Sequence, residues 1–111
     1  MIAVPFDPGL FTARIDLEAP VEVSDGQGGL VTTFALVSRH WARIEPVRSA
    51  SDELGHVLRD ETSHRIWIRA VPGVATGMRF RKGARNFLIE TVRDPDESGR
   101  YLVCACREER S

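Results

Sequence analysis

Short runs of alternating apolar and polar residues, each closed by a turn rich in glycine or proline, dominate this sequence. The clearest run is RIDLE at residues 14–18, which continues through Val21 and Val23. Alternation with a period of two is typical of a strand that buries one face. The DGQGG turn at residues 25–29 is the strongest hairpin signal, because glycine tolerates positive φ. We therefore expect residues 30–37 to return antiparallel to the first strand.

Further strands are predicted along the rest of the chain, and no run has convincing helical length. They cover residues 37–46, 62–71, 74–80, 86–92 and 101–106. Pro46 ends its strand because proline cannot donate a backbone hydrogen bond. The pattern predicts an all-β fold: a small antiparallel β-barrel or sandwich of about six strands with one long loop.

The chain length fits one domain over residues 1–111, because 111 residues lie inside the usual range for a single core. Three peripheral segments are expected: an N-terminal arm at 1–12, a polar loop at 47–61 and a charged tail at 107–111. Loops of this length in small domains are usually functional or disordered.

Composition excludes several classes of partner and structure. Hydrophobic residues make up 42% and charged residues 28% of the chain, as in an ordinary globular protein. Fifteen Lys and Arg face 16 Asp and Glu, a net charge of -1, so no global charge attracts nucleic acid or an anionic membrane. The longest stretch without charge or histidine, 26–38, is too short to cross a bilayer, and the N-terminus lacks the basic start of a secretory signal. We expect an intracellular protein with no membrane partner.

Cys104 and Cys106 lie two residues apart in an apolar strand, which is unfavourable for a relaxed disulfide and unlike the usual zinc knuckle. We interpret them as buried thiols. His40, His56 and His64 are scattered and show no catalytic spacing. The sequence therefore predicts no catalytic residue, no metal site and no cofactor.

A basic hairpin tip and an acidic turn are candidates for contacts between subunits. The tip contains Arg79, Arg81 and Lys82, and the turn contains Asp94, Asp96 and Glu97. Two complementary patches on one subunit suit head-to-tail packing of copies, because a heterologous interface joins two different surfaces. For the basic tip, the alternatives are a solvated turn and a phosphate contact.

Trp41 and Trp67 fall on the polar-rich faces of their strands, beside Arg43 and Arg69. Two interpretations stay open for them. In the first, the stems of neighbouring arginines cover the indoles. In the second, the indoles belong to a protein interface, where Trp and Arg are enriched.

The order of these features resembles the phage head-tail joining family, the small head-closure or stopper proteins of long-tailed phages and gene transfer agents. The likeness runs from about residue 14 to residue 108. It rests on RIDLE at 14–18, DGQGG at 25–29, WARIEP at 41–46, HRIWIR at 64–69, GMRF at 77–80, NFLI at 86–89 and the strand at 101–106.

The resemblance implies a non-enzymatic connector at the virion neck, made in the bacterial cytoplasm. It implies a homo-oligomeric ring of six copies between the portal or adaptor ring and the tail terminator, with DNA passing through the channel. The loop at 47–61 would gate the channel or dock a partner. Its candidate residues are Arg48, Asp52, Glu53, Leu54, His56 and Arg59.

Two other functions stay open from the sequence. One is a single-stranded nucleic-acid-binding β-barrel that uses the basic hairpin and exposed aromatic residues. The other is an accessory domain of a hydrolase. Salt-dependent binding of oligonucleotides by a monomer would favour the first of these over the connector.

Overall fold

The computed structural model describes residues 8–47 and 62–109, which form six strands and one short 3-10 helix, η1 (Pro8–Leu10). Their bounds are β1 (Ala13–Ser24), β2 (Leu30–Pro46), β3 (His64–Arg69), β4 (Arg79–Lys82), β5 (Arg85–Arg93) and β6 (Tyr101–Glu109). Within these residues there is no helix long and apolar enough to cross a membrane.

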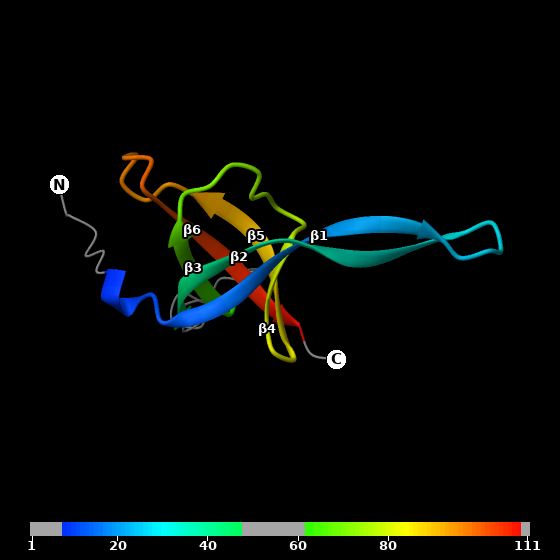
Figure 1. Ribbon diagram of the computed structural model, residues 1–111, viewed down its shortest axis with the longest axis horizontal. Coiled ribbons are helices and arrows are strands. Elements are labelled where there is room, and N and C mark those ends of the chain that lie inside the picture. Colours follow the sequence, from blue (N-terminus) through cyan, green and yellow to red (C-terminus); the bar gives the residue numbers. More distant parts are fainter. Residues whose placement is uncertain (1–7, 48–61, 110–111) are drawn as a thin grey trace, which may run out of the picture.

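All six strands belong to one antiparallel sheet that closes on itself in the order β1-β2-β3-β6-β5-β4 (Figure 1). Closure is made by the pairing of β1 with β4, where Leu17 lies opposite Phe80. The predicted all-β fold is confirmed, and the closed sheet selects the barrel over the sandwich.

The core lies inside this closed sheet and is built from the inward faces of all six strands. Its fully buried side chains include Ile15, Leu17, Ile66, Ile68, Phe80, Phe87, Ile89, Cys104 and Cys106. The aromatic rings of Phe80 and Phe87 lie on directly opposite residues of β4 and β5. Alternation places these residues inward, because successive side chains of a strand point to opposite faces.

The β1–β2 hairpin continues well past the barrel and gives the molecule its long axis of 54 Å (Figure 1). The pairing of β1 with β4 ends at Glu18, and that of β2 with β3 begins only at Arg43. Beyond these points β1 and β2 pair only with each other among the described residues. The turn at the tip uses Gly26 and Gly28, both at positive φ.

A register shift between Leu17 and Glu18 marks the place where the hairpin leaves the barrel. Ser38 lies opposite Leu17 but Leu36 lies opposite Glu18, so Val37 is an extra residue in β2. Bulges of this kind bend a strand and increase its twist. The sequence runs at 30–37 and 37–46, predicted separately, therefore form one strand with a bend.

Two predicted boundaries were wrong. The run at 74–80 contributes only Arg79 and the residue that follows to β4, because Gly77 adopts φ 96 and the amide of Met78 donates to the carbonyl of Ala75 in a turn. At the other end, residues 107–109 continue β6 and are no free charged tail. Glu108 pairs there with Phe87.

All three expected peripheral segments fall partly outside the described residues, the tail at 107–111 only in residues 110 and 111. Of the N-terminal arm at 1–12, residues 8–12 are described, and Phe11 packs edge-on against Tyr101 with ring centroids 5.5 Å apart. Of the loop at 47–61, only Val47 is described.

The core should dominate the stability of the barrel. We expect Ile68→Ala to lower the free energy of unfolding by about 2–5 kcal/mol, because Ile68 is fully buried and its removal leaves a cavity. Leu30→Ala, at a position that is 65% exposed, should stay within about 0.5 kcal/mol of the parent. Urea denaturation followed by circular dichroism measures both, and equal losses in the two variants would contradict this assignment of the core.

Candidate functional site

The part of the hairpin beyond the barrel, residues 19–36 and here called the projecting hairpin, carries a large share of the exposed apolar side chains. They are Val21, Val23, Leu30, Val31 and Leu36, each between 42% and 65% exposed. Exposed apolar residues that lie next to one another mark interaction surfaces more often than scattered ones do. This surface is therefore the first candidate functional site.

A buried ion pair fixes the base of the projecting hairpin to the barrel. Glu18 is only 6% exposed, and its Oε1 accepts a hydrogen bond from Arg79 Nε at 2.7 Å. The guanidinium of Arg79 also lies over the ring of Phe34, 4.0 Å from the centroid. Glu18 belongs to β1, Arg79 to β4 and Phe34 to β2, so this cluster holds the hairpin at the angle at which it leaves the sheet.

The basic tip is less available for external contacts than its sequence indicated. Arg79 is engaged by Glu18, and Arg85 binds Glu108 through two hydrogen bonds of 2.8 and 3.1 Å. Arg81 lies 3.9 Å from Glu18 and donates to the carbonyl of Gly83. Lys82 and the outer part of Arg81 are exposed, and these remain candidates for contacts between subunits.

The acidic turn mainly uses its carboxylates to build itself. Asp94 Oδ2 accepts the amide of Gly99 at 2.7 Å, and Asp96 Oδ1 accepts the amide of Ser98 at 3.1 Å. Hydrogen bonds from Ser98 lower the pKa of Asp96. Glu97 is exposed at φ 58. Because β5 begins at the basic tip and ends at this turn, the two patches lie at opposite ends of one strand.

The two tryptophans occupy neighbouring places on the outer face of the sheet. Trp67 lies opposite Arg43 in the β2–β3 pairing, and Trp41 is two residues before Arg43. Trp67 is half-buried and donates from Nε1 to Glu45 at 3.3 Å. Trp41 is 54% exposed and is partly covered by the guanidinium of Arg14, 5.2 Å from its ring centroid. Arginine therefore covers part of Trp41, and Glu45 holds Trp67; the assignment of either indole to a protein interface stays a prediction.

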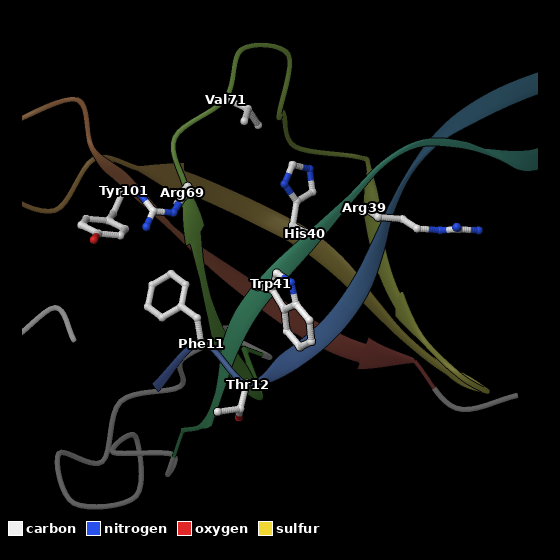
Figure 2. Close-up of a pocket in the computed structure, with 8 residues that line it drawn as sticks. All are labelled: Phe11, Thr12, Arg39, His40, Trp41, Arg69, Val71 and Tyr101. Atoms are coloured by element: carbon white, nitrogen blue, oxygen red, sulfur yellow. The ribbon is translucent and has the colours of Figure 1, made fainter. Parts of the chain in front are cut away.

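A pocket of about 690 Å³ opens where β2 and β3 separate (Figure 2). Their pairing ends at Arg43 and Trp67, and the pocket lies beyond these residues. Its walls come from the stretch before β1, from β2, from the end of β3 and from the start of β6. They are Phe11, Thr12, Arg39, His40, Trp41, Arg69, Val71 and Tyr101. The pocket is largely aromatic, it contains two arginines, and none of its lining residues is acidic.

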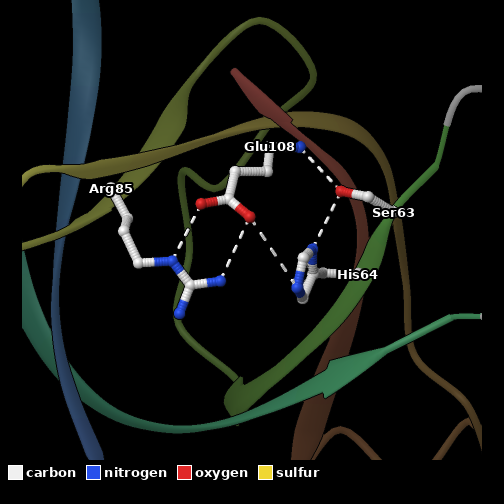
Figure 3. A network of polar contacts seen from close by, with 4 residues as sticks. All are labelled: Ser63, His64, Arg85 and Glu108. Atoms are coloured by element: carbon white, nitrogen blue, oxygen red, sulfur yellow. Dashed lines mark hydrogen bonds and ion pairs between the residues drawn. The ribbon is translucent and has the colours of Figure 1, made fainter. Parts of the chain in front are cut away.

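A polar network joins the start of β3 to the end of β6 (Figure 3). The amide of Glu108 donates to Ser63 Oγ at 2.7 Å, and Ser63 Oγ lies 2.8 Å from His64 Nδ1. The carboxylate of Glu108 binds Arg85 through both oxygens and lies 4.0 Å from His64 Nε2. Hydrogen bonding with Glu108 raises the pKa of Arg85.

The contact of serine, histidine and glutamate in this network invites comparison with a hydrolytic triad. In a triad the carboxylate orients the histidine through a direct hydrogen bond. Here the carboxylate of Glu108 is directed at Arg85, and the distance to His64 exceeds a hydrogen bond. We interpret the network as a structural clasp between strands, which sequence reasoning missed because its members lie far apart in the chain.

The clasp also bears on the loop expected at 47–61. The amide of Val47 donates to the carbonyl of Ser63, and the amide of Ser63 donates to the carbonyl of Cys106, both at 2.8 Å. The chain therefore leaves and re-enters the barrel at one place. The candidate loop residues Arg48, Asp52, Glu53, Leu54, His56 and Arg59 lie outside the described residues.

The cysteines are core residues, as predicted. Both are fully buried and unpaired, and burial raises the pKa of Cys104 to about 12. Burial raises the pKa of Cys106 as well. Thiols of this kind are protonated and inert at neutral pH.

The projecting hairpin is the main surface that the sequence analysis missed. A hairpin was predicted, but its extension beyond the barrel was not. The available signal was the stretch at 26–38, which is the longest one without charge or histidine, next to an alternating run that continues to Val23.

Comparison with known proteins was informative at the level of family and fold. The sequence model of the phage head completion protein family matches residues 6–109. No curated protein matches the chain.

Two of the solved structures that match resemble nearly the whole chain. One is a chain of the virion of a native gene transfer agent particle, with 27% identity and a TM-score of 0.65 over 90% of this chain and 96% of that chain. The other is a protein from Shigella flexneri 2a solved in solution, with 24% identity and a TM-score of 0.70 over 96% of this chain and 99% of that one. The second shows the fold alone.

The ion pair at the base of the hairpin should contribute measurably to stability. We expect Glu18→Gln to lower the free energy of unfolding by about 1–3 kcal/mol, because Arg79 then loses a charged hydrogen-bond partner in a half-buried place. Glu22→Gln, at an exposed position farther along β1, is the matched control and should change it by less than about 0.5 kcal/mol. A double-mutant cycle with Arg79→Gln that gives no coupling would contradict this assignment.

The free energy of unfolding should fall as the pH is lowered through the range in which histidine side chains titrate. Burial lowers the pKa of both His40 and His64, so as the pH falls the unfolded chain takes up protons at these residues before the folded protein does. The free energy of unfolding should therefore decrease as the pH falls from about 7 through this window. His64→Asn should reduce that slope in urea melts at a series of pH values, and an unchanged slope would contradict the account.

Proposed function

Because this chain belongs to the phage head completion protein family, we propose that it closes the filled head of a tailed phage or gene transfer agent and offers the tail its docking surface. It is a structural protein of the virion head and neck. In the proposed arrangement, copies of the chain form a ring of six between the portal or adaptor ring and the tail terminator. The ring retains the packaged DNA.

One observation carries this proposal: the family match extends over residues 6–109, nearly the whole chain. The likeness to a chain of a gene transfer agent virion covers a similar share. A single domain over residues 1–111 would then supply the barrel, the projecting hairpin and the loop to one ring.

The surfaces of the molecule agree with a part that is made to contact other proteins. The projecting hairpin exposes apolar side chains that a solitary domain of this size has no reason to display. Trp41 is exposed on β2, Arg81 and Lys82 are exposed at the basic tip, and Glu97 is exposed in the acidic turn. Within the proposed ring we assign these residues, with Trp67, Arg79, Asp94 and Asp96 behind them, to contacts between subunits or with neighbouring rings.

The charge of the chain suits a channel through which DNA passes. The formal net charge is -1, so a ring of copies would neither bind the duplex strongly nor repel it by a large field. The loop at 47–61, with Arg48, Asp52, Glu53, Leu54, His56 and Arg59, is the segment that we assign to channel closure or docking.

Single-stranded nucleic-acid binding is less well supported. That function needs exposed aromatic rings on which bases stack, next to unpaired cations. Phe80 and Phe87 are fully buried, and Arg79 and Arg85 are engaged by carboxylates. The basic hairpin therefore lacks the stacking platforms that the alternative requires.

Particles made without this chain should contain heads that fill with DNA and then lose it. We expect such heads to be sensitive to nuclease and to lack tails, because nothing seals the portal or receives the tail. Adding the purified chain should restore nuclease protection and tail attachment, measured by the protected DNA and by counting tailed particles.

The matched control is the Thr91→Ser chain, which changes an exposed side chain outside the surfaces described above and should restore protection fully. Heads that keep their DNA and join tails without the chain would contradict the proposed function. Salt-dependent binding of oligonucleotides by the isolated chain, with normal heads in its absence, would favour the alternative.

A further inference from the structure

The core-facing side of β1 continues without interruption onto the open part of the projecting hairpin. Ile15 and Leu17 point into the barrel, and Ala19 still packs against the core. Val21 and Val23 follow at the same period of two, so they lie on the same face of the strand. The apolar face of β1 thus extends beyond the core of the barrel.

The partner strand completes this face. Ala35 lies opposite Ala19, Thr33 opposite Val21, and Val31 opposite Val23. Residues directly opposite one another in an antiparallel pair share a face. The result is a ribbon face with no charged residue, whereas the other face carries Glu22 together with Leu30, Phe34 and Leu36. We call it the apolar ribbon face.

A two-stranded ribbon that leaves such a face in water is marginally stable by itself. Residues 19–24 span roughly 20 Å of extended chain beyond the last pairing with β4, at about 3.3 Å per residue. No third strand pairs with this part among the described residues. A surface of this reach and chemistry is suited to packing on another molecule.

The pocket lies at the other end of β1. Thr12, which lines it, directly precedes Ala13, where β1 begins, and the hairpin tip follows Ser24, where β1 ends. An extended strand of 12 residues separates Thr12 from the hairpin tip by about 40 Å. Two different surfaces at opposite ends of one subunit are the geometry that a head-to-tail assembly requires.

The charges of the two surfaces are complementary. From residue 19 to residue 38 the chain contains Glu22 and Asp25 and no cation. Of the two arginines of the pocket, Arg39 is bound to Asp16 at 3.1 Å, so the positive charge offered to a partner comes from Arg69, which lies over the ring of Tyr101. Trp41 is exposed there, and no acidic residue lines the pocket. Its volume of about 690 Å³ is within the range of pockets that enclose a small ligand.

We infer that the projecting hairpin of one copy packs its apolar ribbon face and its acidic tip into the Trp41 pocket of the next copy around the ring. The occupant of the pocket is therefore a second copy of this chain. The inference rests on the proposed connector function, because it supplies the contact that would link the subunits of that connector.

Cross-linking between introduced cysteines tests the contact directly. The double variant Leu30→Cys/Val71→Cys places one thiol at the hairpin tip and one in the pocket wall. A short bismaleimide should link it into a ladder of oligomers, both in concentrated solution and in assembled particles. Cys104 and Cys106 do not interfere because they are fully buried. Each single variant should give no more than dimers, and Leu30→Cys/Thr91→Cys, with its second thiol outside the pocket, should give no ladder.

Removal of the two complementary charges provides the independent readout. Asp25→Asn, which keeps an oxygen to accept the amides of Gln27 and Gly29, and Arg69→Gln should each weaken self-association by roughly tenfold, as for the loss of one favourable contact worth about 1.4 kcal/mol. The double variant should be no weaker than either single variant in sedimentation velocity, because both remove the same contact. Val23→Asp/Val31→Asp should abolish the ladder, whereas Thr32→Asp, on the opposite face of the ribbon, should leave it unchanged.

The nuclease-protection assay on the same variants separates this inference from the proposed function. Protected heads without any ladder, in solution or in particles, overturn the inference and leave the function standing. The Val23→Asp/Val31→Asp variant also overturns it if that variant keeps the ladder but no longer attaches to heads or tails, because the hairpin then serves another protein. A ladder with unprotected heads supports the contact and contradicts head closure.

Discussion

The structure depends on one constraint: the apolar face of β1 is longer than the core that the barrel can offer it. Ile15 and Leu17 fill the interior, and the same period of two then carries Val21 and Val23 into solvent. A strand cannot turn its apolar face inward where there is no interior. An exposed apolar face of this kind lowers solubility unless another protein covers it. This requirement connects the fold to a structural role in an assembly.

The second important feature is that the projecting hairpin is fixed firmly to the barrel. Glu18 and Arg79 form their bond where the hairpin leaves the sheet, and Phe34 lies under the guanidinium. The register shift beside Glu18 sets the bend at the same place. A projecting element with a fixed exit angle loses less conformational freedom on binding than a flexible one does. The closed sheet therefore acts as a rigid base that presents the hairpin in one direction.

Much of the fold could be predicted from the sequence, because alternation and turn residues are local signals. The hairpin turn at 25–29 and the buried cysteines were predicted correctly for that reason. The misses involve partners that are distant in the chain. Arg79 was interpreted as part of a cationic tip, since nothing local shows that it binds Glu18 of a distant strand. Residues 107–109 read as a tail, since Arg85, which binds Glu108, lies in another strand. The extension of the hairpin beyond the barrel was not predicted, because the alternation of apolar and polar residues is the same in a strand inside the barrel and in one outside it.

The central claim is that the exposed surface of this barrel exists to hold neighbouring proteins at the neck of a virion. Imaging of purified particles by electron cryomicroscopy, focused on the neck, tests it most directly. The account predicts a ring of barrels between head and tail, with each projecting hairpin covered by protein density. Necks that lack the barrel, or barrels whose hairpins extend uncovered into solvent, would contradict it.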